Sequence, residues 1–432
     1  MTAIYTPPQY AVSDSELIPV ADYPRRLLKI PPSRMFSIRE ALRVYLANNG
    51  PDAVIFDASQ GDGGKSLPGV PPEILQRALA LQLEHGTGYD KPYGFDGFRE
   101  AVVNLYWKLR PEFGWGPSNV LGGVGGRDVL TKAFQAMLYL GNGCVGDAIL
   151  TSAVPWISYN WGPYAVGLNV LRAPGDSASA WAIAADGLQE AVQFAAKSGR
   201  KIAGLLITSP DNPTGRTLPI SEQIALAHQA LELGVEYVLF DWIYHWVTDG
   251  DPHDINAVLD AFSPEERERL MFLDGLTKSL GGSNIRNAHL LASKKVIDFI
   301  ISIASHGVFP DFFGQAVAVA SYEMGYANAA AHTIRTTAES RAVLRNLLQA
   351  GGYHHIIGDG YYAFIDIEDF CAPGEDSEHI GEMLAQQYGV AVVPGMHFSD
   401  AGRYWIRFSY AMPVERTQGA FQRMDAGLKS RR

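Results

Sequence analysis

Short apolar runs alternate with helix-like segments between about residues 145 and 295. The runs are rich in β-branched and other apolar residues, which is typical of buried strands. The candidate strands are ILTSAV (149–154), NVLRA (169–173), GLLITS (204–209), YVLFD (237–241), MFLDG (271–275) and HLLAS (289–293). Strands that alternate with helices favour a mainly parallel sheet flanked by helices, so we expect an α/β fold.

One helix can be delimited between two of these strands. The segment SEQIALAHQALELG predicts a helix that Ser221 caps and Gly234 ends. Its apolar face is formed by Ile224, Ala227 and Leu231. In a parallel sheet of this kind, ligands bind beyond the carboxyl ends of the strands. The residues that follow each strand are therefore the first candidates for chemistry.

Composition narrows the class of partner. Basic residues number 35 and acidic residues 46, which gives a net charge of −11 and disfavours nucleic acid or an anionic membrane as the main partner. The two cysteines, Cys144 and Cys371, form no metal or redox motif. The first thirty residues contain no apolar core of a signal peptide, so we expect a cytoplasmic enzyme acting on a small molecule.

Polar residues follow three strands in a suggestive order. GLLITS leads into Pro210-Asp211-Asn212-Pro213-Thr214-Gly215, YVLFD ends on Asp241 with Tyr244 one turn later, and MFLDG leads into Lys278 and Arg286. Each alone has an ordinary structural explanation as a turn, a helix cap or a surface cation. Together, at the ends of neighbouring strands, they indicate a site.

The segments SPDNPTG, FDWIYH and LTKSLGGSNIR resemble the cofactor-binding motifs of the aspartate aminotransferase superfamily, the fold-type I pyridoxal-phosphate enzymes. The resemblance extends from about residue 55 to 412. It implies that Lys278 carries pyridoxal 5'-phosphate as a Schiff base and moves the proton at the substrate's Cα. It further implies that Asp241 pairs with the pyridine nitrogen, Asn212 and Tyr244 contact the phenolate oxygen, and Arg286 binds the phosphate.

Two other segments extend the expected cofactor site. VLGGVGGRDVLTKAF fits a phosphate cradle at a helix start, in which Gly125 lets the backbone approach and the N–H groups of Gly126 and Arg127 point at the anion. Its glycines do not match the dinucleotide pattern GxGxxG. The resemblance assigns Trp156 to stacking on the cofactor ring, although it could equally be a core aromatic. Thr277 is expected to help hold the phosphate.

The resemblance also covers the substrate and the assembly. In YWIRFSYA, Arg407 corresponds to the arginine that binds the substrate's α-carboxylate, and Gly61 matches a backbone contact with the same group. In GYDKPYGFDGFREAV, Tyr89 corresponds to a tyrosine that reaches the neighbouring subunit's cofactor phosphate. A homodimer with shared active sites is therefore expected. Residues 305–314 and the arm over 23–36 are candidate pocket walls.

Three departures mark a divergent member of this superfamily. Gly275 stands where a phosphate-binding hydroxyl is usual, Trp242 replaces a common glutamate, and Asn287-Ala288 replaces the usual Val-Gly. The expected architecture has three parts. Residues 1–59 form an arm and part of a small domain, residues 60–315 form the large cofactor domain, and residues 316–432 complete a small α+β domain.

Several functions stay open at this point. Transamination is the leading hypothesis, and the alternative is elimination, replacement or cyclisation of the kind catalysed by 1-aminocyclopropane-1-carboxylate synthase, on S-adenosylmethionine or an arginine derivative. VIFDASQGDGGKS resembles the end of a P-loop but has Ser59 where that motif needs glycine. The segment before the superfamily match is too short for a regulator's DNA-binding domain. His245, His253 and the pair His354-His355 lack the spacing of a zinc site.

Overall fold

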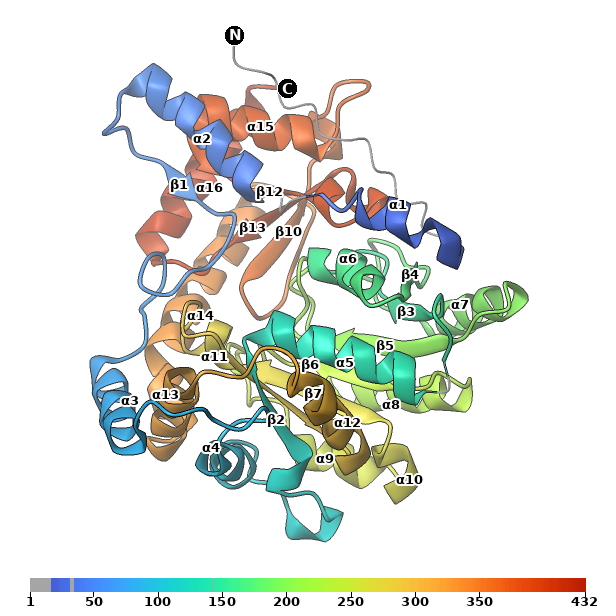
Figure 1. Cartoon of the computed structure of the whole chain (residues 1–432). Coiled ribbons are helices and arrows are strands. Elements are labelled where there is room, and N and C mark those ends of the chain that lie inside the picture. The colour runs from blue at the N-terminus through green and yellow to red at the C-terminus, as the bar shows by residue number, and fades with distance from the viewer. Residues whose placement is uncertain (1–16, 32–34, 142) are drawn as a thin grey trace.

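The structure, a computed structural model of the chain, describes residues 17–31, 35–141 and 143–432. Its centre is a seven-stranded sheet with the order β2-β8-β7-β6-β5-β3-β4 (Figure 1). The strands are β2 (Val120–Val124), β3 (Ala148–Thr151), β4 (Asn169–Arg172), β5 (Ile202–Thr208), β6 (Val238–Asp241), β7 (Leu270–Gly275) and β8 (Asn287–Ala292). Strands β4, β3, β5, β6 and β7 are parallel, and β8 runs antiparallel to both of its neighbours.

The six strands expected from the sequence are confirmed, and one was missed. Strand β2 has the sequence VLGGV, and its two glycines weaken the strand signal because glycine has no side chain to pack. The expected helix is α8 (Ile220–Glu232), but the capping prediction was wrong. Pro219 occupies the cap position, so Ser221 already lies in the first turn and caps nothing.

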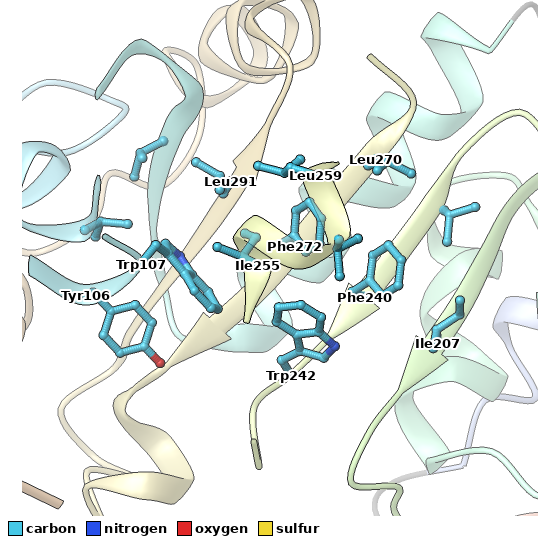
Figure 2. Close-up of a cluster of buried hydrophobic side chains, with 14 of the residues drawn as sticks. Tyr106, Trp107, Ile207, Phe240, Trp242, Ile255, Leu259, Leu270, Phe272 and Leu291 are labelled. Carbon is cyan, nitrogen blue, oxygen red and sulfur yellow. The ribbon is translucent and has the colours of Figure 1, made fainter. Parts of the chain in front are cut away.

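Side chains alternate between the two faces of the sheet, as the pleat of a strand requires. In β5, Leu205 and Ile207 pack on one face and Leu206 on the other. Figure 2 shows the first face, where Phe240, Trp242 and Phe272 lie together with Tyr106 and Trp107. That face is covered by α3 (Pro72–His85), α4 (Asp96–Ala101), α7 (Ala185–Lys197), α8, α9 (Ile255–Ala261) and α13 (Phe312–Glu323). The opposite face is covered by α5 (Gly126–Leu140), α6 (Ile157–Ala165) and α12 (Lys294–Ala304).

A second, smaller layer is built from both ends of the chain. Its antiparallel sheet has the order β12-β13-β10-β9, and a two-stranded pair, β1 with β11, lies beside it (Figure 1). These strands are β1 (Phe56–Asp57), β9 (His355–Ile357), β10 (Tyr362–Asp366), β11 (Val390–Ala391), β12 (Val393–Pro394) and β13 (Trp405–Ser409). The helices here are α2 (Met35–Asn49), α14 (Tyr326–Ala350), α15 (Ser377–Tyr388) and α16 (Val414–Lys429).

The expected fold class, a mixed sheet flanked by helices plus a smaller α+β part from both chain ends, is thus confirmed. The boundaries at residues 59/60 and 315/316 stay a prediction. Short helical segments complete the chain: η1 (Val20–Asp22), α1 (Tyr23–Leu27), η2 (Val102–Tyr106), η3 (Pro111–Phe113), η4 (Pro117–Asn119), α10 (Pro264–Arg267), α11 (Leu276–Ser279), η5 (Glu368–Phe370), η6 (Gly395–His397) and η7 (Asp400–Gly402). In the described ranges, no helix has the length and apolar character needed to span a bilayer.

Two of the three departures from the superfamily pattern face each other. Gly275 of β7 pairs in register with Ala288 of β8. A Cβ added at Gly275 would lie 2.8 Å from the Ala288 Cβ and 2.7 Å from the Asn287 carbonyl oxygen. Compared with the usual superfamily pattern, this chain lacks a side chain at position 275 and has an added methyl group at position 288, on the neighbouring strand. The third departure, Trp242, is fully buried in the core and donates its indole N–H to Gln223 Oε1 at 2.8 Å.

We expect Gly275→Ala to lower the free energy of unfolding by about 1–3 kcal/mol, because the new methyl group meets fixed backbone. Adding Ala288→Gly should recover part of this loss by removing the opposing methyl group, with a favourable coupling of about 0.5–3 kcal/mol. Denaturant unfolding of both single variants and the double variant measures this coupling. Strictly additive effects would show that the two positions are independent.

Candidate active site

A cavity of about 400 Å³ lies at the edge of the large sheet where β5, β6 and β7 end, and residues of the smaller sheet form its opposite wall. This size and placement are typical of small-molecule sites. The cavity is lined by Gln60, Gly61, Asp62, Gly126, Arg127, Trp156, Ile157, Tyr159, Thr208, Asn212, Asp241, Ile243, Tyr244, Leu273, Thr277, Lys278, Ser283, Arg286, Tyr362, Val393, His397, Phe398 and Arg407.

Lys278 reaches this cavity from α11, the single turn of helix that follows β7. Its Nζ lies 5.8 Å from the ring centre of Tyr244 and 5.5 Å from that of Tyr361. The Tyr361 hydroxyl donates to the Lys278 carbonyl oxygen, and this hydrogen bond helps to hold the short helix in place. The amine itself has no carboxylate partner within 4 Å among residues 17–31, 35–141 and 143–432, so it is available for reaction.

Asp241 ends β6 at the floor of the cavity and is 4% exposed. Its Oδ2 accepts a hydrogen bond of 2.6 Å from the Tyr159 hydroxyl, and its Oδ1 accepts one of 3.2 Å from the Ile243 N–H. Burial raises the pKa of Asp241 more than these two hydrogen bonds lower it, and the pKa is about 6 as a result. A cation placed beside it in the cavity would reverse this shift.

Two guanidinium groups converge at the other end of the cavity. Arg127 follows Gly126 at the start of α5, and Arg286 lies just before β8 with a φ of +57°. Burial, together with the positive charge of Arg286, lowers the pKa of Arg127. In the described parts of the chain, neither arginine has an ion pair with a carboxylate. A Cβ at Gly125 would lie 2.3 Å from Arg286 Nη2, so only glycine permits this approach. Two close cations at a helix start form a site for an anion.

A third guanidinium lies on the wall formed by the smaller sheet. Arg407 of β13 is 4% exposed, and it donates to Asn212 Oδ1 and to the Ser59 carbonyl oxygen, each at 2.6 Å. Its Nε finds no acceptor, and no carboxylate pairs with it within the described residues. A buried cation left in this state is costly unless an anionic ligand completes it. Gly61 lies nearby, and a Cβ there would meet the Ala411 Cβ at 2.4 Å.

Most residues predicted from the sequence line this one cavity, and a few do not. Tyr89 is fully exposed and absent from its lining, as are residues 305–314 and residues 23–31 of the arm. Residues 32–34 of that arm lie outside the described residues. Reasoning from sequence missed several lining residues. They are Gln60, Asp62, Tyr159, Thr208, Ser283, Tyr362, His397 and Phe398. Four of them, Gln60, Asp62, Thr208 and Ser283, lie in segments quoted above but were given no role, and the others reach the cavity only through tertiary packing.

The residues weighed for other functions lie elsewhere. Lys65 of the P-loop-like segment is exposed and pairs with Asp62 at 3.3 Å. His245 is buried behind the sheet and lies 2.7 Å from the Asp274 carboxylate. His253 contacts the Ser209 carbonyl oxygen at 3.1 Å. Within the described residues no group of three or more His, Cys, Asp and Glu side chains could hold a metal ion.

Comparison with known proteins agrees with this geometry. Residues 51–424 match the family described as aminotransferase class I and II. The chain belongs to the class I and II aminotransferase family. This aminotransferase is 24% identical to an aspartate aminotransferase of Geobacillus stearothermophilus, over 94% of its own length and 99% of the relative's. It is 27% identical to an aspartate/prephenate aminotransferase of Thermus thermophilus, over 92% and 97% of the two chains.

Solved structures share the fold of this aminotransferase. A double mutant of Thermus thermophilus aspartate aminotransferase superposes with a TM-score of 0.78 at 24% identity, covering 93% of this chain and 98% of that one. An aromatic aminotransferase from Pyrococcus horikoshii gives a TM-score of 0.75 at 21% identity, covering 91% and 99%. Class I and II aminotransferases of this type use pyridoxal 5'-phosphate, and this aminotransferase is a pyridoxal-phosphate-dependent enzyme. The names of these relatives favour transamination over elimination, replacement or cyclisation.

The residues present fit that cofactor. It carries an aldehyde, a ring nitrogen that is cationic when protonated, and a phosphate. The cavity offers an amine at Lys278, a buried carboxylate at Asp241 and two guanidinium groups without carboxylate partners at Arg127 and Arg286. Trp156 also lies beside them, with its ring 5.5 Å from the Arg127 guanidinium carbon.

The buried carboxylate gives a prediction for the cofactor-free protein. In the folded protein the pKa of Asp241 is raised from 3.8 to about 6. Its contribution to the free energy of unfolding is therefore complete below pH 3.8 and is lost as the pH rises through 6. We expect Asp241→Asn to become more stable relative to wild type by about 3 kcal/mol between pH 4 and pH 8. Denaturant unfolding across that range measures the difference.

The matched control is Asp186→Asn, which makes the same substitution at an exposed position outside the cavity. Cofactor binding should abolish the effect at Asp241, because the cationic ring nitrogen restores the carboxylate's low pKa. Parallel pH profiles of wild type and Asp241→Asn in the cofactor-free state would contradict the predicted titration.

Proposed function

We propose that this aminotransferase transfers the amino group of an α-amino acid to a 2-oxo acid, with Lys278 as the amine that binds the cofactor's aldehyde. One observation carries the proposal. An amine, a buried carboxylate and three guanidinium groups converge on a single cavity, and none of the guanidinium groups has a carboxylate partner in the described part of the chain. Bound pyridoxal phosphate supplies an electron sink for the carbon that loses its proton. Every other task falls to the chain's own residues.

Asp241 holds a proton on the ring nitrogen, and Tyr159 keeps its carboxylate in position by a 2.6 Å hydrogen bond. The phosphate is bound by Arg286, Arg127, the N–H of Gly126 and the hydroxyl of Thr277. These groups take the place of the hydroxyl that is missing at Gly275. This assignment is supported by the two converging guanidinium groups, which have no carboxylate partner among the described residues.

The remaining cofactor contacts come from three side chains. Asn212 and Tyr244 hydrogen-bond the phenolate oxygen, and Trp156 stacks on the ring. Their support is that all three line the cavity close to Lys278 or Arg127. These contacts would hold the ring next to the Lys278 amine.

Arg407 binds the substrate's α-carboxylate from the cavity wall, and Asn212 and the backbone at Gly61 help to fix it; the hydrogen bonds to Asn212 Oδ1 and the Ser59 carbonyl oxygen hold the guanidinium in place. A planar guanidinium recognises a carboxylate through two parallel hydrogen bonds. With the cofactor bound, Lys278 would take the proton from the substrate's Cα and would return it at the carbon of the cofactor's aldehyde group. A lysine suits both steps because its amine is a flexible base on a long stem.

The active unit is a homodimer, and Tyr89 of each subunit reaches the phosphate of the other subunit's cofactor. Tyr89 is fully exposed within one chain, beyond the end of α3. Leu79 and Leu83 of α3 and Val308 ahead of α13 are exposed apolar side chains on packed neighbouring elements. Exposed apolar groups on adjoining elements favour a protein interface.

Borohydride reduction followed by peptide mapping tests the role of Lys278. We expect one reduced adduct, at position 278, and its loss in Lys278→Ala together with a fall in turnover of about 10²–10⁴-fold. Lys294→Ala, which removes an exposed lysine on α12, should leave both unchanged. Formation of a 2-oxo acid with an aminated cofactor establishes transamination. Release of a leaving group without amination of the cofactor would contradict it.

Subunit mixing tests the role of Tyr89. We expect Tyr89→Ala and Lys278→Ala to be separately inactive at limiting cofactor. After the subunits exchange, one intact site per heterodimer should restore about a quarter of wild-type activity. If Tyr89 acts within its own subunit, each heterodimer has no intact site and mixing restores nothing.

A further inference from the structure

Tyr362 is a cavity-lining phenol that no motif predicted. It begins β10, is 2% exposed and lies on the strand next to β13, which carries Arg407. The register pairs Arg407 with Phe364, so Tyr362 is the diagonal neighbour of Arg407 on the same face of the smaller sheet. Lys278 and Tyr244, in contrast, come from the edge of the large sheet. Tyr362 therefore touches groups of both layers.

Three contacts connect Tyr362 with the residues given roles above. The Arg407 guanidinium carbon lies 4.0 Å from the centre of its ring. The Tyr244 hydroxyl donates to the Tyr362 hydroxyl at 3.2 Å. The positive charges of Lys278 and Arg407 outweigh burial and lower the pKa of Tyr362, whereas burial raises the pKa of Tyr244. The other titratable group against it is Tyr361, whose ring centre is 6.1 Å away.

The number of protons in this hydroxyl pair limits how it can work. A phenol has one proton to donate. In the structure Tyr244 uses its one proton in the hydrogen bond that it donates to Tyr362. If Tyr244 is to donate to the phenolate oxygen of the cofactor, the hydrogen bond between the two phenols must reverse, and Tyr362 must then donate to Tyr244. Lys278 and Arg407 favour that direction, because adjacent cations make a phenol a better donor.

We propose that Tyr362 is a positioning residue with two separable parts. Its hydroxyl donates to Tyr244 and turns the single Tyr244 proton toward the cofactor, and its ring holds the Arg407 guanidinium flat for the substrate's carboxylate. The inference rests on the proposed roles of Lys278, Tyr244 and Arg407. It goes beyond them because it connects the cofactor side of the cavity with the carboxylate side through one side chain.

Tyr362→Phe separates the two parts, since it removes one oxygen and keeps the ring. We expect the pH midpoint of the visible absorbance of the lysine-bound cofactor to rise by about 0.5–1 pH unit. Without the hydrogen bond that Tyr244 accepts from Tyr362 in the proposed arrangement, Tyr244 is a weaker donor to the phenolate oxygen and stabilises the unprotonated linkage less. Tyr244→Phe should shift the midpoint in the same direction. The affinity for a simple carboxylate inhibitor should stay within about twofold of wild type.

Tyr362→Leu also removes the ring and should weaken carboxylate binding by about 3- to 30-fold. The matched control is Tyr410→Phe, which removes another fully buried hydroxyl, one that donates to the Gly358 carbonyl oxygen at 3.3 Å. It should change neither quantity.

Two results would overturn the inference. One is a Tyr362→Phe midpoint equal to wild type while Tyr244→Phe shifts it, and the other is an equal shift in Tyr410→Phe. These outcomes are distinguishable from failure of the proposed function, which would appear as the absence of any reduced adduct at Lys278 in the wild-type protein.

Discussion

The buried carboxylate of Asp241 is the constraint around which the site is organised. A carboxylate held in this apolar position is costly unless a cation lies against it, and the protein places none there. At the far end of the same cavity the opposite condition holds, because Arg127 and Arg286 repel each other without an anion between them. The cavity therefore has complementary ends, and a ligand with a cationic ring and an anionic tail satisfies both.

The sheet fixes the distance between those ends. Thr208, Asp241 and Leu273 are consecutive register partners at the carboxyl edge of β5, β6 and β7. Strand β8 runs the other way, so its beginning lies at the same edge and brings Arg286 beside the helix start at Gly126. Neighbouring strands lie roughly 4.8 Å apart, so each functional side chain is set by its strand's place in the order. The smaller sheet adds the opposite wall of the cavity, through Arg407 and Tyr362.

The part of the site that lies at strand ends could be predicted from sequence, because a strand followed by polar residues is a local pattern. Asn212, Asp241, Lys278 and Arg286 were found in this way, and all line the cavity. Tyr159 could not be found, since a tyrosine inside a helix has no local signal, and only packing brings its hydroxyl to Asp241. Tyr362 was missed for a similar reason. Its neighbours are distant in the sequence, because Tyr244 follows β6 of the large sheet and Arg407 lies on the adjacent strand β13.

The fold showed the same division between local and distant information. Strands with β-branched cores were evident, whereas β2 was hidden by its glycines and became a strand only because β8 pairs with it along its whole length. The start of α8 was misplaced because a proline, whose fixed backbone angle suits the position before a helix, took the place expected for serine. The domain boundaries stay a prediction, and so does the proposed contribution of Tyr89 to a neighbouring site, which needs contacts between two subunits.

The pairing of Gly275 with Ala288 limits which substitutions these two positions tolerate. A side chain at position 275 meets fixed backbone while the methyl group at 288 remains, and loss of that methyl group alone leaves a gap in a fully buried strand. We therefore expect either single substitution, at position 275 or at position 288, to give a lower free energy of unfolding than the present pair or the usual superfamily pair. The two positions therefore constrain each other, and a side-chain hydroxyl at position 275 is sterically excluded while Ala288 is present.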